Sequence, residues 1–236
     1  MSGVHGRNCE LRISTGETVR TGVALTPHPD PFLASRGVFK SPDRNWKWVG
    51  KGELGAARVT YESPAGITKE IDSNSFNIHY ADGSVRIPPE DLPGLVAGTV
   101  RADYVALQME QIGNLLSDER EFELNLEAEL VDTTTIGENY KSFAEGIGEW
   151  SGTLTGLYLN AERFKLAQPI SGIIPRRNLR LRPRPDQNTY WQGNVIFPKW
   201  GISGGFDSVI ERSTEFTGSG PLDLIEDGKP VFPGLS

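Results

Sequence analysis

Residues 121–130 read EFELNLEAEL, and this stretch decides the fold class. Apolar side chains occupy every second position from 122 to 130, and glutamate or asparagine stands between them. Side chains two residues apart on a β-strand point to the same face of the sheet. The stretch therefore predicts a strand with one face in a hydrophobic core and a polar face that carries Glu121, Glu123, Glu127 and Glu129.

The acidic face of this strand has more than one interpretation from the residues alone. Neighbouring like charges destabilise a strand unless water, cations or basic partners screen them, and a solvated outer face meets that need. Glycoside hydrolysis is the enzymatic interpretation, because positions two apart on a strand lie about 7 Å apart, near the separation of catalytic carboxylate pairs. Trp150, Trp191 and Trp200 would then be sugar platforms, although tryptophans of a β domain more often lie in the core.

The composition favours a turn-rich β protein over a helix bundle. The 236 residues include 27 Gly and 16 Pro, with 37% hydrophobic and 9% aromatic residues. This length suffices for one sizeable core or two small ones. The chain is acidic, with 24 Lys and Arg against 31 Asp and Glu. No run approaches 18 apolar residues and the first twenty residues lack the order of a secretory signal, so we expect a soluble, unexported chain with no membrane partner.

Metal, nucleotide and nucleophile motifs find no support in the sequence. A single cysteine excludes an intrachain disulfide and a cysteine-cluster zinc site, and His5, His28 and His79 are too scattered to suggest a histidine cage. The nearest stretch to a phosphate-binding loop, residues 50–55 (GKGELG), lacks the spacing and the hydroxyl of that motif. Gly-x-Ser-x-Gly and His-Glu-x-x-His are also missing. The residues therefore suggest no metal site, and they leave catalysis unsupported but not excluded.

The rest of the chain predicts further strands and three irregular stretches. Ala81-Asp82-Gly83-Ser84 predicts a two-residue hairpin loop, and Asn160 caps a predicted short helix that Pro169 ends. The irregular stretches are a long loop at 132–150, a loop-rich insertion with one or two hairpins at about 20–98, and an unpacked C-terminal tail. Strands are expected at residues 8–13, 57–61, 76–80, 100–109, 150–159, 195–200 and 208–217.

Five arginines stand within nine residues of a proline-bounded segment. Its proline spacing forbids a regular helix, so the segment predicts an extended arm or an edge strand. Nucleic-acid binding, a solvated loop and a contact between copies are all open interpretations. Residues 110–145 hold ten acids and two bases, whereas residues 163–184 hold seven bases and no acid, which favours a head-to-tail contact between copies. The arginines are Arg176, Arg177, Arg180, Arg182 and Arg184.

Three groups of residues resemble the tail tube (major tail) proteins of long-tailed bacteriophages. The central group is VDTTTIG at 131–137, followed by YKSF at 140–143, Gly146-Ile147, Trp150-Ser151-Gly152 and Gly156, and it is similar to the family pattern "dvTTfGd…yipGl…wsGs…G". The other two are the opening HGRN at 5–8 and the ending GNV at 193–195, Gly201-Ile202 and ERSTEFTGSG at 211–220. The resemblance covers roughly residues 1–15 and 110–222, and the stretch at 20–98 has no counterpart in it.

The resemblance implies an all-β fold, a β-sandwich or barrel with one short flanking α-helix and long loops. It implies a single domain over residues 1–236, with its core at about 1–15 and 100–220, an insertion at about 20–98 and a C-terminal tail at 221–236. It also implies self-assembly into stacked hexameric rings that form a virion tail tube for DNA ejection, without catalytic residues or cofactor. Another tail ring component, a terminator or baseplate hub, is the alternative within the same fold, and a β-sandwich glycosidase or carbohydrate-binding module is the unrelated one.

The resemblance also assigns roles to residues. Glu121, Glu123, Glu127 and Glu129 line the lumen, where an acidic wall repels duplex DNA instead of binding it. The five arginines lie at contacts between subunits. Implied partners are further copies of the chain, the tape measure, terminator and baseplate proteins, and passing double-stranded DNA that is not specifically bound, in a tail made in the host cytoplasm. The loop that touches the adjoining ring contains Asp132, Thr133, Thr134, Thr135, Tyr140, Lys141, Phe143 and Ile147.

Overall fold

Antiparallel β-strands build most of the described chain, which confirms the all-β prediction. The computed structural model describes residues 4–7, 10–49, 56–62, 65–88, 99–111, 119–132, 143–157, 176–184, 186–203 and 211–232. Its one helix in these ranges is the short α1 (Pro31–Ala34), capped by the Asp30 carboxylate, which accepts a hydrogen bond from the backbone N–H of Phe32. The helix predicted at 160–168 lies outside the described residues. None of the described helical structure has the length and apolar character needed to cross a bilayer.

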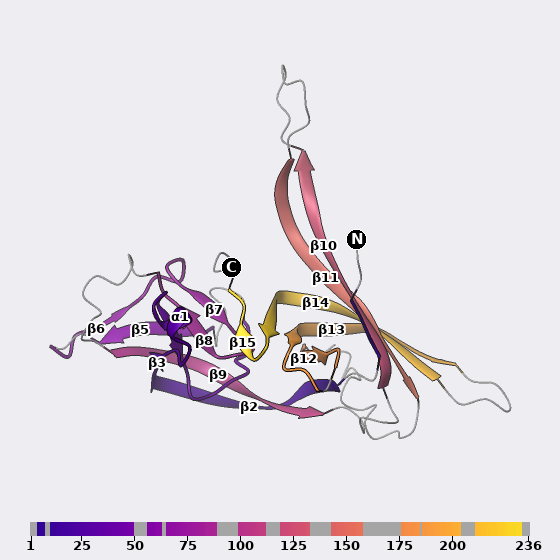
Figure 1. Ribbon diagram of the computed structural model, residues 1–236, viewed down its shortest axis with the longest axis horizontal. Coiled ribbons are helices and arrows are strands. Elements are labelled where there is room, and N and C mark those ends of the chain that lie inside the picture. Colours follow the sequence, from indigo (N-terminus) through magenta and orange to yellow (C-terminus); the bar gives the residue numbers. More distant parts are fainter. Residues whose placement is uncertain are drawn as a thin grey trace, which may run out of the picture.

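The strands form one large and one small sheet (Figure 1). In order across the large sheet lie β1 (Val4–Arg7), β10 (Glu119–Asp132), β11 (Phe143–Leu157), β14 (Glu211–Glu226), β13 (Tyr190–Ser203), β12 (Arg177–Arg182), β2 (Glu10–Ala24), β9 (Thr99–Gln111), β5 (Arg58–Glu62) and β6 (Thr68–Glu70), with β15 (Lys229–Pro230) paired to β14. The small sheet has the order β3 (Thr26–Pro27), β4 (Val38–Lys40), β8 (Ser84–Arg86) and β7 (Asn77–His79). The strands predicted at 57–61, 76–80 and 100–109 are therefore confirmed as β5, β7 and β9.

The large sheet curls around a first hydrophobic core. Four strands separate β10 from β2 in the sheet, yet Phe122 of β10 and Ile13 of β2 belong to one cluster of buried side chains. Only a curved sheet can bring two strands that are separated by four others together around one core. The other members of the cluster are Leu124, Trp150, Leu154, Leu179, Leu181, Val195, Phe197 and Phe216.

A second core lies among residues of the 20–98 stretch and β9. Trp46 is completely buried there, and its ring stacks on Tyr104 of β9 with the ring centroids 4.0 Å apart. The β5–β6 and β7–β8 pairs are the hairpins expected in the insertion. β2 connects the two cores, because Ile13 lies in the first and Val23 packs against the second.

Two predicted loops differ in the structure. β11 begins at Phe143, so the second part of the predicted 132–150 loop is a strand, because its ladder with β10 continues as far as the pair Asp132 and Phe143. The β7–β8 hairpin has a four-residue loop and not a two-residue one, since His79 pairs with Ser84. Gly83 in that loop has a φ of +69°, a conformation that glycine adopts without strain.

The predicted unpacked tail is wrong for residues 221–232. β14 continues to Glu226, β15 follows it, and Phe232 is buried. The glycines of this stretch suggested a flexible tail. Gly218 instead allows β14 to pack closely on Trp150, because a Cβ there would lie only 2.1 Å from a carbon of the Trp150 ring. The end of the described chain is thus part of the packed structure.

The arginine-rich segment is an internal strand, which corrects the prediction of an arm or an edge strand. β12 pairs with β13 on one side and with β2 on the other. Residues 177–182 contain no proline, so a six-residue strand keeps every backbone donor for both ladders. Its four central residues are buried.

Candidate self-association surface

The β10–β11 hairpin projects away from the body of the molecule (Figure 1). Near the body, β1 pairs with residues 121–124 of β10, and β14 pairs with residues 151–157 of β11. Beyond these points β10 and β11 pair only with each other among the described residues. We call residues 125–132 and 143–150, which form this outer two-stranded part, the ribbon.

One face of the hairpin is acidic, as the alternation in the sequence predicts. Glu121 and Glu127 are exposed and Glu123 is half-buried. Glu149 of β11 is also exposed and stands directly opposite Glu127 in the ladder. Like charges in directly opposed positions destabilise a strand pair. The side chain of Glu129 lies outside the described part of the structure.

Glu149 and Glu215 belong to this acidic face, and the sequence analysis missed both. Glu215 of β14 is exposed and pairs with Thr153, which in turn pairs with Glu123 across β11. The face therefore spans three adjacent strands. Glu149 fell in a predicted loop, so its place became visible only once the pairing of β10 with β11 was known.

The other face of the hairpin is still apolar where the strands leave the hydrophobic core. Phe122 and Leu124 are buried, but Leu126, the next residue on the same face, is 53% exposed. Opposite Leu126 is Trp150, which is buried, whereas Gly148 and Glu149 beside it on β11 are exposed. A leucine exposed on a core-facing row is a surface that a further protein layer can cover.

Packing at the hairpin base explains the glycines of the Trp-Ser-Gly motif and its partners. A Cβ on Gly152 would lie 2.0 Å from the Glu123 carbonyl oxygen and 2.5 Å from the Phe216 ring, so the strands approach too closely for any side chain. Gly193 lies under the Trp150 ring in the same way, at 2.6 Å. The motif residues therefore build the base of the hairpin.

Trp150 and Trp191 belong to the first core and are not exposed sugar platforms. Trp150 is buried in the first core, and its indole N–H donates a hydrogen bond to the Gly220 carbonyl at 2.9 Å. Trp191 is half-buried and packs against the same core, while the side chain of Trp200 lies outside the described residues. The described residues also contain no group of three or more His, Cys, Asp or Glu arranged to hold a metal ion.

Most of the predicted ring-contact loop falls outside the described residues, including Thr133, Thr134, Thr135, Tyr140 and Lys141. Asp132 ends β10 and Phe143 begins β11, where the two are paired, and Ile147 lies further along β11. These residues therefore occupy the outer ribbon or its tip. Their contact with an adjoining ring stays a prediction.

The five arginines in and next to β12 differ in how deeply they are buried. Arg180 is only 8% exposed; its Nε donates to Gln192 at 2.8 Å, its Nη2 donates to Asn45 at 2.6 Å, and its guanidinium lies over the Tyr190 ring. This side chain is taken up by contacts inside its own chain. Arg177 and Arg182 are half-buried, whereas Arg176 and Arg184 at the two ends are exposed. A role in contacts between subunits stays a prediction, and the two exposed ends suit it best.

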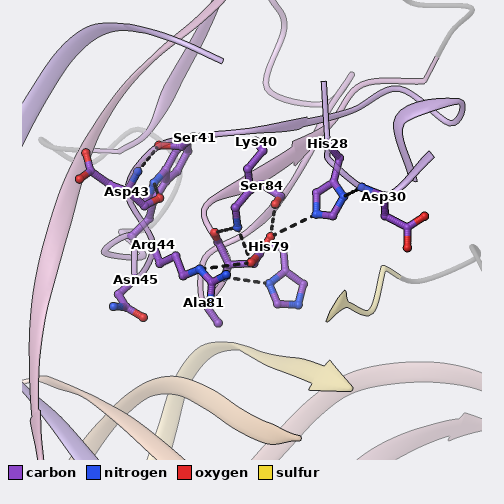
Figure 2. A network of polar contacts seen from close by, with 12 residues as sticks. His28, Asp30, Lys40, Ser41, Asp43, Arg44, Asn45, His79, Ala81 and Ser84 are labelled. Carbon is purple, nitrogen blue, oxygen red and sulfur yellow. Dashed lines mark hydrogen bonds and ion pairs between the residues drawn. The ribbon is translucent and has the colours of Figure 1, made fainter. Parts of the chain in front are cut away.

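A buried polar network lies apart from the hairpin, centred on Asp82. The Lys40 ammonium and the Ser84 hydroxyl donate to the Asp82 carboxylate, and Nε2 of His28 lies 3.7 Å from it. Figure 2 shows that Lys40, Ser84 and His28 point toward one another. Burial raises the pKa of Asp82, but the ammonium of Lys40 and the hydrogen bonds more than offset this, and the pKa lies below its usual value. Burial lowers the pKa of His28, which favours its neutral form.

His79 joins this network to the C-terminal strand β14. Its Nε2 faces the Leu224 carbonyl at 2.9 Å, and its Nδ1 lies 3.3 Å from the backbone nitrogen of Asp82 and 3.7 Å from the Asp223 carboxylate. Asp223 accepts the backbone N–H of Ala81 at 2.8 Å, and burial raises the pKa of this carboxyl. The network therefore fastens Asp223 and Leu224 of β14 to residues 79–82 of the insertion.

Comparison with family models and with curated proteins finds no match for this chain. Two solved structures are similar to it. The tail of an empty GTA particle, in C6 symmetry, is 20% identical with a TM-score of 0.39, over 50% of this chain and 87% of that one. The virion of a native gene transfer agent particle gives 20% identity and a TM-score of 0.39, over 50% and 89% of the two chains. Neither similarity assigns a role to a residue of this chain.

Proposed function

We propose that the protein is a structural component of a phage-like tail, whose copies assemble head to tail into hexameric rings that stack into a tube for DNA. The resemblance of residues 131–156 and 193–220 to tail tube proteins suggests this assembly. The observation that carries the proposal is the ribbon, which presents an acidic face and an exposed leucine on its core-facing side.

The ribbon has three features that a single copy leaves unresolved. Two-stranded ribbons are marginally stable in water. Glu127 and Glu149 oppose each other directly, and Leu126 is exposed on an apolar row. Contact with a second copy adds strands or a covering layer and removes the leucine from water, while a wide wet channel screens the opposed glutamates. A head-to-tail contact of this kind closes into a ring or continues as a filament.

The acidic face is assigned to the bore of the tube. Duplex DNA carries about one negative charge per 1.7 Å of its axis, so a basic wall would bind it in a salt-dependent way and stall its passage. An acidic wall repels DNA, and in a wide wet channel charges further apart than about 10 Å are largely screened at ordinary ionic strength. Glu121, Glu123, Glu127 and Glu129 are the proposed lumen residues, and the exposed Glu149 and Glu215 extend the same face.

The remaining contacts follow from this arrangement. The residues that would touch the adjoining ring are Asp132, Thr133, Thr134, Thr135, Tyr140, Lys141, Phe143 and Ile147. The exposed Arg176 and Arg184 would face an acidic surface of a neighbouring copy. The tape measure, terminator and baseplate proteins would meet the tube at its interior and ends. The protein would be made in the host cytoplasm and act in the virion. A terminator or baseplate ring is the second candidate, because the same surface also builds a single ring.

Electron microscopy of the purified chain at rising concentration tests the proposal. We expect six-membered rings or hollow tubes for the wild type and monomers for Leu126→Glu, which places a charge on the apolar row. Val19→Glu is the matched control, because Val19 is 73% exposed on β2, away from the hairpin. Assemblies without an axial channel, or normal rings from the Leu126 variant, would contradict the proposal.

A further inference from the structure

We propose that residues 45–48 of the insertion hold the base of the β10–β11 hairpin in position, so that the insertion fixes the direction in which the ribbon leaves the body. The insertion has no counterpart in the family that the chain resembles, so this role concerns the present chain. The inference does not depend on tube assembly, because every contact that supports it lies inside one copy.

The first step is that segment 45–48 is fixed to the second core. Trp46 is completely buried and stacks on Tyr104. The backbone N–H of Lys47 donates to the Val105 carbonyl at 2.7 Å, and the Leu107 N–H donates to the Asn45 carbonyl at 2.7 Å. The segment therefore adds to the edge of β9 and moves with the second core.

The second step is that the same segment is hydrogen-bonded to β12 and β13, two strands of the first core. The Asn45 side-chain oxygen accepts hydrogen bonds from Arg180 at 2.6 Å and from Gln192 at 3.3 Å. The Trp48 carbonyl accepts one from the Asn194 side chain at 3.0 Å. Asn45 has a φ of +60°, and its contacts on both sides support this uncommon conformation. Segment 45–48 is thus a rigid connector between the two cores.

The third step leads from the connector to the hairpin. The Trp48 ring lies against Gly220 of β14, where a Cβ would come within 2.6 Å of the ring carbons. The carbonyl of the same glycine accepts the indole N–H of Trp150 at 2.9 Å. Gly220 has a φ of +99°, so its backbone shape is one that glycine alone adopts freely. Trp48 and Trp150 therefore hold Gly220 from two sides.

The fourth step is the place of Trp150 in the hairpin. Trp150 is buried, whereas Glu149 beside it on β11 and its ladder partner Leu126 are exposed. Among the described residues no third strand pairs with the ribbon beyond this point, so the packing of Trp150 on Gly193, Gly218 and Gly220 sets the ribbon's direction. Trp48 is accordingly a positioning residue that acts through Gly220 and Trp150.

Distance measurements on the isolated copy test the inference. Spin labels are placed at Glu127→Cys on the ribbon and Glu226→Cys on the body, after the single native cysteine has been changed by Cys9→Ser. Trp48→Ala should broaden and shift the distribution of label distances. It should also raise hydrogen exchange of the ribbon amides by about tenfold, because a loosened base lets the two strands open locally. Gly220→Ala should act in the same direction.

Phe32→Ala is the matched control, since this aromatic residue of the insertion is half-exposed on α1. It should leave both measurements at their wild-type values. Trp48→Phe keeps an aromatic ring and should give a smaller change in the same direction, and it serves as the test variant if Trp48→Ala does not fold. Wild-type distances and exchange in the Trp48 variants, or an equal response to Phe32→Ala, would overturn the inference.

Discussion

At the scale of single residues, the buried carboxylate of Asp82 shows how the insertion keeps its shape. It is almost fully removed from water, and the Lys40 ammonium neutralises it. Removal of one member of a buried pair costs about 3–5 kcal/mol, because the other charge is left without a partner. We expect Asp82→Asn to lower the free energy of unfolding by about 3 kcal/mol, measured by denaturant titration. The exposed Asp186→Asn should change it by less than about 0.5 kcal/mol.

The same residue gives a pH dependence with a defined sign. The folded-state pKa of Asp82 lies below the value of the unfolded chain, so the unfolded state binds the proton more readily. The contribution of Asp82 to the free energy of unfolding is complete when the pH is above the ordinary carboxyl pKa. It is lost as the pH falls through the lower folded-state pKa. The lowered pKa of His28 acts in the same direction, since protonation favours the unfolded chain. Asp82→Asn should therefore flatten the acid side of the stability profile, and an unchanged slope would contradict this account.

Glycine substitutions in the hairpin base separate close packing from backbone freedom. A methyl group on Gly218 would overlap the Trp150 ring, so Gly218→Ala should destabilise the fold by about 1–3 kcal/mol through overpacking. Gly148→Ala is the control on β11, because a Cβ there meets its nearest atom at 3.9 Å. It should be neutral or slightly stabilising. Thermal unfolding of the two variants distinguishes them, and equal losses would mean that packing on Trp150 is not the cause.

At the scale of elements, the sequence predicts strands where one strand carries its own signal. The alternation at 122–130 identified β10 and its acidic face because apolar and charged side chains differ so strongly there. β11 lacks such a signal at residues 143–149, where glycine and glutamate are common, and it is a strand because β10 supplies the ladder. The spacing of the prolines predicted an arm or an edge strand at β12, yet its two neighbouring strands and the contacts of Arg180 bury it.

The opposed glutamates of the ribbon allow a charge-reversal test of this element. Glu127→Lys or Glu149→Lys alone turns a like-charge pair into an opposite-charge pair and should stabilise the ribbon by about 0.2–1 kcal/mol. The double variant restores a like-charge pair and should return close to wild type. Hydrogen exchange of the ribbon amides measures all three. Equal stabilisation by the double variant would show that the pair itself is not responsible.

At the scale of the whole molecule, the end of the described chain fastens the insertion to the large sheet. Phe232 packs with Leu33 and Val38, and its ring meets that of His79 edge-on at 5.5 Å. None of this was predictable, because the partners are more than 140 residues away in the sequence. Phe232→Ala should cost about 3–5 kcal/mol in unfolding free energy. The neighbouring Val231→Ala is the control, since Val231 is partly exposed. Similar losses from both would contradict a specific role of Phe232.

The assignment of the acidic face to a DNA channel makes its own prediction for assembled tubes. Wild-type tubes should retain no duplex DNA even at low salt, because the wall that DNA meets repels it. Tubes with Glu121→Lys, Glu123→Lys and Glu127→Lys should retain DNA at low salt and release it as the salt concentration rises. The reason is that the logarithm of the binding constant for phosphate contacts falls linearly with the logarithm of the salt concentration. Glu70→Lys, on the exposed edge strand β6, adds the same kind of charge elsewhere and is the control. Filter retention of labelled DNA measures the effect at several salt concentrations. DNA held by wild-type tubes, or by the Glu70 variant as strongly as by the triple variant, would place the acidic face outside the channel.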